Sequence, residues 1–228
     1  MAELRIGDLP YAGRPRQTSS SMPLETFTAA SIFALVMAFT PGPNNAMLAS
    51  SGARFGVTRS IPHVMGVTVG FPIMLFVVGL GLASILLASH LLQLIMKTVS
   101  CAYLLWLAFQ IAISSAGVSD GAGGKPFTFL QAAAFQWINP KAWLMAVSAI
   151  SAYTAGTGGR LYLQVAIIAV ITVVVSLAST LTWTAFGAAI RLFLRSALAL
   201  RLFNVAMALL LLVSTAPILM EIWHAVKA

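Results

Sequence analysis

The chain has 228 residues, of which 60% are hydrophobic and 8% charged, and its mean hydropathy is +0.95. A soluble domain carries about 25% charged residues, so this composition excludes a water-soluble domain and predicts the lipid bilayer as the main solvent. The net charge of +8 comes from 13 Lys and Arg scattered singly along the chain. Such scattering is typical of membrane-protein loops, so we expect no nucleic-acid partner.

Residues 1–24 differ in composition from the rest of the chain. Charged residues alternate there with Gly, Pro and Ser, and no apolar run precedes residue 24. This pattern predicts a disordered tail and is unlike a cleavable signal peptide. Met22 heads the run Met-Pro-Leu-Glu-Thr-Phe, and our hypothesis is that translation begins at Met22. The intact mass of the native protein would test it.

The remainder, residues 25–228, is apolar enough to form a single transmembrane domain. We predict an all-α membrane protein, with helical segments near or above the ~20 residues that cross a bilayer. It divides into two halves, 25–113 and 127–223, joined by a Gly- and Ser-rich loop from Ser114 to Pro126. The six predicted segments are approximately 25–53, 61–88, 91–113, 127–154, 161–187 and 199–223.

Small residues in two of these segments are interpreted as packing positions. Gly66-x-x-x-Gly70 places two glycines on one helix face, which lets a neighbouring backbone approach closely in lipid. Cys101 is the single cysteine and lies in an apolar run, so no disulfide framework exists and a packing role is expected.

The distribution of cations predicts the orientation in the membrane. Loops one, three and five hold six Lys or Arg, whereas loops two and four and the C-terminus hold only Arg160 and Lys227. The positive-inside rule then puts the odd loops in the cytoplasm and both termini in the periplasm. Arg14 and Arg16 argue for the opposite orientation if residues 1–21 are translated.

The first segment contains a predicted helix break. It reads Phe39-Thr40-Pro41-Gly42-Pro43-Asn44-Asn45, and two prolines flanking a glycine do not fit a continuous helix. Carbonyls freed at membrane depth have no water to bind. Such a break therefore has to face protein or a wet cavity.

The fourth segment contains a second break, in the run Gln136-Trp137-Ile138-Asn139-Pro140-Lys141. Pro140 interrupts the helix, and Lys141 places a cation at membrane depth, where insertion costs about 2.5–3.5 kcal/mol. That cost indicates a partner or an aqueous cavity.

The two breaks occupy corresponding positions in the two halves. Three helices per half is an odd number, so the halves enter the membrane from opposite sides as an inverted repeat, and paired interruptions of this kind are typical of a transport site. Short helices restart at Pro43 and Pro140, and their positive N-terminal ends favour an anion such as a carboxylate. The alternative is structural: both prolines only kink their helices, and Lys141 caps carbonyls or snorkels.

The run Phe39-Thr-Pro-Gly-Pro-Asn-Asn-Ala-Met, the pair Gly52 and Gly56, and Phe135-Gln-Trp-Ile-Asn-Pro-Lys-Ala-Trp resemble the LysE/RhtB family of amino-acid exporters. The likeness covers essentially residues 22–228. It implies a six-helix secondary transporter of the inner membrane that expels amino acids or close derivatives, and often a homodimer. The doubled Asn44-Asn45 leans toward the branch that handles cysteine and O-acetylserine.

The expected mechanism is alternating access around a central site. Asparagine amides bind the substrate, the helix N-termini and Lys141 take its carboxylate, and carbonyls near Phe39 and Thr40 take its ammonium. Gln110, Ser176 and Thr180 are further lining candidates, as is Gln136. The predicted substrate-binding residues are Thr40, Pro41, Gly42, Pro43, Asn44, Asn45, Gln136, Asn139, Pro140 and Lys141.

No acid stands in the interior of a predicted segment to carry a proton, since the five Asp and Glu lie in tails, loops or helix ends. His63, at the start of the second segment, is the nearest titratable candidate; its alternative role is that of an interfacial histidine. Coupling through Lys141 or through the substrate's own amine also stays open.

Two other functions were weighed against export. An intramembrane enzyme is not supported, because the chain has no Gly-x-Ser-x-Gly, His-Glu-x-x-His or aspartate-pair motif, and Gly124-Lys125 lacks the other residues of a phosphate loop. No catalytic residue, metal or cofactor is therefore expected. A channel or a non-transporting membrane scaffold is the remaining alternative, although no filter motif or ring of like charge is visible.

Overall fold

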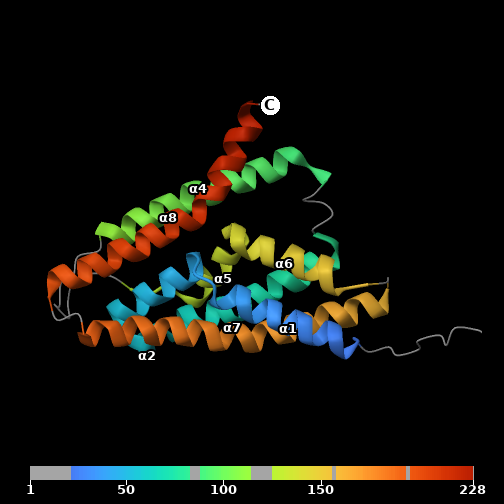
Figure 1. The fold of residues 1–228 in the computed structure, drawn as a ribbon, viewed down its shortest axis with the longest axis horizontal. Helices are drawn as coiled ribbons and strands as arrows, with labels where there is room; N and C mark the ends of the chain where they lie inside the picture. Colours follow the sequence, from blue (N-terminus) through green and yellow to red (C-terminus); the bar gives the residue numbers. More distant parts are fainter. Residues whose placement is uncertain (1–21, 83–87, 114–124, 156–157, 194–195, 228) are drawn as a thin grey trace, which may run out of the picture.

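A computed structural model describes residues 22–82, 88–113, 125–155, 158–193 and 196–227, and these residues form helices and their short links, without a strand. The predicted tail over 1–21 and the predicted loop over 114–124 lie outside them. The all-α prediction is confirmed. The elements are α1 (Leu24–Phe39), α2 (Pro43–Val77), the π-helical turn η1 (Val78–Leu82), α4 (His90–Ile113), α5 (Phe129–Ile138), α6 (Pro140–Tyr153), α7 (Gly159–Phe193) and α8 (Ala197–Lys227) (Figure 1).

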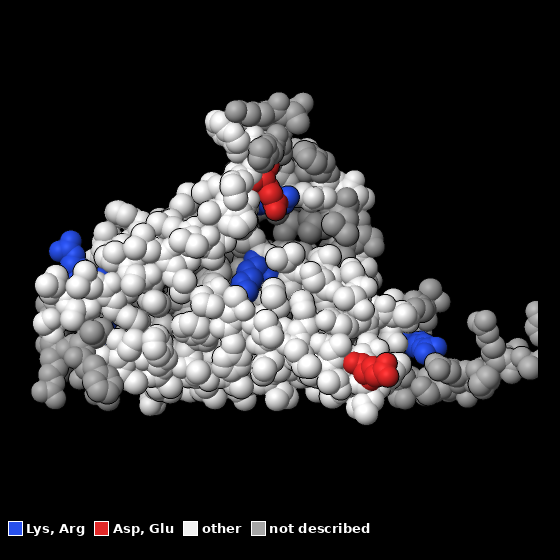
Figure 2. Space-filling view, in the orientation of Figure 1, with Lys and Arg blue, Asp and Glu red and all other residues white. Residues whose placement is uncertain are grey.

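Among the residues that the structure describes, four stretches are long and apolar enough to cross a membrane: Pro43–Leu82, Leu91–Ile113, Gly159–Arg191 and Arg201–Trp223. Helix α1 is apolar but has only 16 residues, and α5 and α6 have 10 and 14. The surface in Figure 2 is mostly white, with few charged side chains on its broad middle. The chain is a multi-span helical protein, and the arrangement of six crossings stays a prediction.

The predicted loop between residues 53 and 61 is instead a kink within α2. Gly56 adopts φ 77 and ψ 172, a conformation open to glycine and strained for other residues, so one residue turns the chain without a loop. The carbonyls exposed there are occupied: Ser60 Oγ donates to the Gly56 carbonyl at 2.8 Å and Arg191 Nη1 to that of Arg54 at 3.3 Å.

Helices α2 and α7 pack together through two glycines, one on each helix, and each glycine faces the backbone of the other helix. A Cβ on Gly52 would overlap the Thr184 carbonyl, and a Cβ on Gly187 would overlap the Ala49 carbonyl. Close approach through small residues is how helices associate in lipid. The part of α2 that follows the first break is therefore held tightly against α7.

The predicted packing role of Gly66 and Gly70 is confirmed against α5. A Cβ on Gly66 would overlap the Phe129 carbonyl, and one on Gly70 would lie 2.7 Å from the Ala133 Cα. Cys101 is 3% exposed within α4, which agrees with its packing role. Helix α4 pairs with α8 and α1 with α7, and the α4–α8 pair lies over the other helices (Figure 1).

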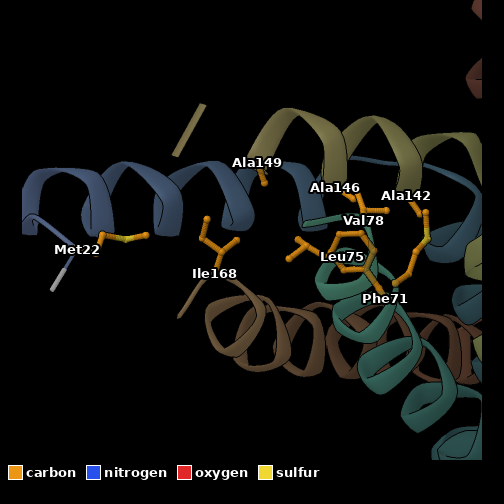
Figure 3. Close-up of a cluster of buried hydrophobic side chains, with 9 residues drawn as sticks. Met22, Phe71, Leu75, Val78, Ala142, Ala146, Ala149 and Ile168 are labelled. Atoms are coloured by element: carbon orange, nitrogen blue, oxygen red, sulfur yellow. The ribbon is translucent and has the colours of Figure 1, made fainter. Parts of the chain in front are cut away.

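A buried hydrophobic cluster joins α6 to α2 and α7. Because the cluster fixes α6, it also fixes the first turn of that helix, which carries Lys141. Figure 3 shows the side chains of Ala142, Ala146 and Ala149 facing those of Phe71, Leu75 and Val78, with Ile168 and Met22 further along.

Candidate functional site

The first predicted break is confirmed at the junction of α1 and α2. Helix α1 ends at Phe39, Thr40 and Gly42 are extended, and α2 begins at Pro43. Pro41 and Pro43 have no N–H to donate to the preceding turn, so carbonyls at the end of α1 are left for other donors.

The amide of Asn45 binds two of these carbonyls. Its Nδ2 donates to the carbonyl of Ala38 at 2.9 Å and to that of Thr40 at 2.9 Å. Ser179 of α7 donates its hydroxyl to the same Ala38 carbonyl at 2.8 Å. Two segments other than α1 thus stabilise its open end.

Lys141 of α6 binds the same end of α1 with its ammonium group. Lys141 Nζ lies 2.6 Å from the Thr40 carbonyl oxygen and 3.4 Å from that of Pro41. The side chain crosses closely over Gly42, where a Cβ would stand 2.8 Å from Lys141 Cδ and 3.0 Å from Nζ. The capping role weighed for this lysine is therefore what the structure shows in this state.

The second predicted break, between α5 and α6, is also confirmed, and it is closed by its own residues. Asn139 is extended, its Oδ1 accepts from the Lys141 N–H at 3.1 Å, and its N–H donates to the Gln136 carbonyl at 3.3 Å. Trp143 Nε1 donates to the Trp137 carbonyl at 2.9 Å. The break is an N-cap of the ordinary asparagine type.

A reciprocal pair of amides joins the two breaks. Asn44 Nδ2 donates to Gln136 Oε1 at 2.8 Å, and Gln136 Nε2 donates back to Asn44 Oδ1 at 3.1 Å. Gln136 is fully buried and also donates to the Ala132 carbonyl at 2.9 Å. The start of α2 and the end of α5, almost a hundred residues apart in sequence, are thus joined by two hydrogen bonds.

A cavity of about 40 Å³ lies where the breaks meet. A water needs roughly 10–15 Å³ of such space, so the cavity has room for a few waters. Its apolar walls come from α1, α2 and α6. Its polar lining comes from Asn44, Asn45, Asn139, Lys141, Ser176, Ser179 and Thr180.

Comparison with known proteins agrees with the resemblance seen in the sequence. The family model of LysE type translocators matches residues 35–221. The chain belongs to this family. Family membership and the apolar helices together make it a multi-pass protein of the inner membrane, and place it with translocators rather than enzymes.

Curated relatives of this chain include two efflux proteins. The cysteine/O-acetylserine efflux protein of Escherichia coli (strain K12) is 35% identical over 125 residues, and that of Salmonella typhimurium is 33% identical over 122 residues. Each match covers 53% of this chain and 62% of the relative. The chain thus spans less than two thirds of the length of these relatives. No solved structure matches the chain.

The structure brings the predicted site residues together in four ways. Gly42, Asn44, Asn45, Asn139 and Lys141 line the cavity. Thr40 and Pro41 contribute carbonyls while their side chains are exposed, Pro43 and Pro140 begin the two helices, and Gln136 orients Asn44.

Of the further lining candidates, Ser176 and Thr180 lie in the cavity wall, whereas Gln110 is exposed on α4 and does not line it. The sequence reasoning missed Ser179. Its spacing from Ser176 and Thr180 puts it on the same face of a helix, and that spacing was the signal that would have found it.

His63 does not belong to this cavity. It is fully buried, so it is not an exposed interfacial side chain. Its Nδ1 lies 2.9 Å from Ser51 Oγ, and its ring stacks on Phe127 with 5.2 Å between centroids. Within the described structure its Nε2 has no hydrogen-bond partner.

Proposed function

We propose that this chain exports an amino acid or a close derivative across the inner membrane. The observation that carries the proposal is the meeting of two helix breaks at one polar cavity. Open backbone inside a membrane protein is tolerated where it lines such a cavity, and paired breaks mark the binding site of many secondary transporters.

The cavity and the carbonyls beside it offer groups of both signs that a zwitterion needs. Thr40 and Pro41 are not among the lining residues, but Lys141, which lines the cavity, binds their carbonyls. The Thr40 and Pro41 carbonyls suit an ammonium group, because they already accept one from Lys141. Gly42 and Asn44, at the start of α2, line the cavity, and no side-chain hydrogen bond caps the first turn of this helix. Its free N–H groups and dipole favour a carboxylate, with Lys141 as a mobile partner.

Cysteine and O-acetylserine are the first substrates to test. The curated relatives are efflux proteins for these compounds. Both are small zwitterions, in keeping with a cavity of about 40 Å³ that must widen to admit any amino acid.

The mechanism that fits this site is alternating access of two inverted halves. Its support is the matching of contacts: α1 packs on α7, and its counterpart α5 packs on α2, while α4 pairs with α8. Under this scheme α1 with the start of α2, and α5 with α6, each make one broken crossing, giving six. The cation distribution then places both termini in the periplasm, and a homodimer remains part of the proposal.

A channel or a scaffold is the competing function. A cavity of about 40 Å³ between helices that are pinned by side-chain hydrogen bonds favours a gated carrier over an open pore. Purified protein in vesicles discriminates the two: saturable, substrate-specific counterflow supports a carrier, and unsaturable leak supports a channel.

Export in cells is tested with an overexpressing strain challenged by toxic concentrations of single amino acids. We expect resistance to cysteine or O-acetylserine with the wild type, and its loss with Lys141→Met and with Asn45→Ala. The matched control is Thr182→Ala, an exposed position of α7 whose hydroxyl bonds only within its own helix. Resistance retained by both site variants would remove the support for this site.

A further inference from the structure

The ammonium group of Lys141 has no acidic partner in the part of the chain that the structure describes. The acids there are Glu25, in the first turn of α1, and Glu221, which pairs with Lys97 at 2.8 Å. Lys141 instead binds two backbone carbonyls at 2.6 and 3.4 Å. A cation at membrane depth is thus held by neutral dipoles of the broken helix.

Those carbonyls are also the groups that best suit the ammonium of a substrate. An ammonium has three N–H donors and no acceptor, and the end of α1 offers the open carbonyls that such a group needs. Two cations cannot bind these carbonyls at once, because they repel at such short separation. The substrate's ammonium and Lys141 must therefore exclude each other from this position.

We propose that Lys141 is a tethered substitute for the substrate's ammonium group. In the empty carrier the Lys141 ammonium binds the Thr40 and Pro41 carbonyls, and when substrate binds, the substrate's ammonium takes its place. This inference rests on the proposed export function. When the substrate binds, Lys141 Nζ leaves the Thr40 and Pro41 carbonyls and turns to the substrate's carboxylate. The empty and loaded sites then carry the same net charge, since the substrate is a zwitterion.

The consequence is a carrier that returns empty without an intramembrane acid. With Lys141 Nζ bound to the Thr40 and Pro41 carbonyls, the unloaded site does not bury these two groups without a donor, so it can reorient. Without the lysine ammonium, the Thr40 carbonyl would keep only Asn45 as a donor and the Pro41 carbonyl would lose Lys141. Burying carbonyls that lack donors is costly in a membrane protein. Only the loaded carrier would then reorient readily, so the protein would exchange substrate across the membrane instead of exporting it.

The test compares two fluxes in vesicles that contain purified protein and labelled L-cysteine under reducing conditions. Net efflux is measured into buffer without substrate, and exchange into buffer with saturating unlabelled L-cysteine. We expect both fluxes with the wild type. Lys141→Met should lower net efflux at least about tenfold more than exchange: the lost contact to the substrate's carboxylate weakens both fluxes, but only net efflux also needs the empty carrier to return.

Gly42→Ala provides a second variant that keeps the lysine. Gly42 is extended, so alanine fits its backbone. The new Cβ would lie 2.8 Å from Lys141 Cδ and 3.0 Å from Nζ, and would push the flexible lysine side chain away from the Thr40 and Pro41 carbonyls. Net efflux should again fall more than exchange. Gly159→Ala is the control, because a Cβ there meets open space.

Equal loss of both fluxes, or no loss of either, in folded Lys141→Met overturns the inference. If Lys141→Met is not recovered as a folded protein, equal effects on the two fluxes in Gly42→Ala overturn it. A wild type that moves neither L-cysteine nor any other amino acid tested contradicts the export function itself. The two failures are therefore distinguishable.

Discussion

The two helix breaks differ in where their hydrogen-bond partners come from. At the first break, the carbonyls of α1 are bound by Asn45, by Ser179 of α7 and by Lys141 of α6. At the second, Asn139 caps its own helix and the neighbouring groups bond within the same short stretch. The first break is thus held by side chains that can move away, whereas the second is closed locally.

This difference follows from the residues that make each break. Pro41 and Pro43 remove two donors and bring no side chain that hydrogen-bonds, so the partners must come from elsewhere. Asn139 precedes a single proline and supplies an oxygen that accepts from the first turn. A site that must open and close is better served by the first arrangement, and a rigid mount for Lys141 by the second.

The largest expected effect tests whether α2, which follows the first break, is packed rigidly against α7. A leucine at Gly187 would overlap the Ala49 backbone, which no rotamer change relieves, so Gly187→Leu should cost at or above the ~3 kcal/mol upper range for overpacking. We expect loss of monodisperse protein in detergent. Gly159→Leu, in the same helix but facing open space, should be recovered normally. Normal recovery of Gly187→Leu would mean that α2 and α7 can separate.

A smaller effect separates the two breaks directly. Asn45→Ala loses two hydrogen bonds, at about 0.5–1.5 kcal/mol each, whereas Asn139→Ala loses one N-cap bond at about 0.5–2 kcal/mol. The apparent melting temperature should therefore fall further for Asn45→Ala. Thr182→Ala, which is exposed, should stay within about 0.5 kcal/mol of the wild type. A larger loss in Asn139→Ala would reverse the assignment of the two roles.

Both breaks were predictable because proline has the same consequence in almost any helix. That Lys141 needs a partner or a wet cavity was predictable too, because a charge in an apolar segment is costly without one. Which partner it has was not predictable: a carbonyl of Thr40 has no side-chain signature, and its availability depends on how α6 packs against α1. Packing across a hundred residues of sequence is a tertiary property.

The kink at Gly56 shows the same limit from another side. Cations and a glycine between two apolar runs are typical of a loop, and a loop was predicted. The structure keeps the helix on both sides, because Ser60 and Arg191 occupy the carbonyls that the kink exposes. The burial of His63 was likewise hidden, since Phe127, which covers its ring, comes from the other half of the chain.

The link between the breaks is tested by a double-mutant cycle. Asn44 and Gln136 exchange two hydrogen bonds, so Asn44→Ala and Gln136→Ala should be non-additive by about 0.5–1.5 kcal/mol. Asn44→Ala combined with Thr182→Ala should be additive, because Thr182 bonds within α7. Melting of the purified variants measures both cycles. Additivity in the Asn44–Gln136 cycle would mean that this amide pair does not couple the two breaks.

The smallest expected effect concerns the redundancy of the first break. The Ala38 carbonyl accepts from both Ser179 and Asn45, so Ser179→Ala alone should cost about 0.5–1 kcal/mol, the lower part of the range for one hydrogen bond. In an Asn45→Ala background the same change removes the last side-chain donor to that carbonyl and should cost more, measured again as the shift in melting temperature. The second break has no such duplicate, since Asn139 alone caps α6. If Ser179→Ala costs the same in both backgrounds, Ser179 and Asn45 act independently on the Ala38 carbonyl, and the first break is not held by redundant donors.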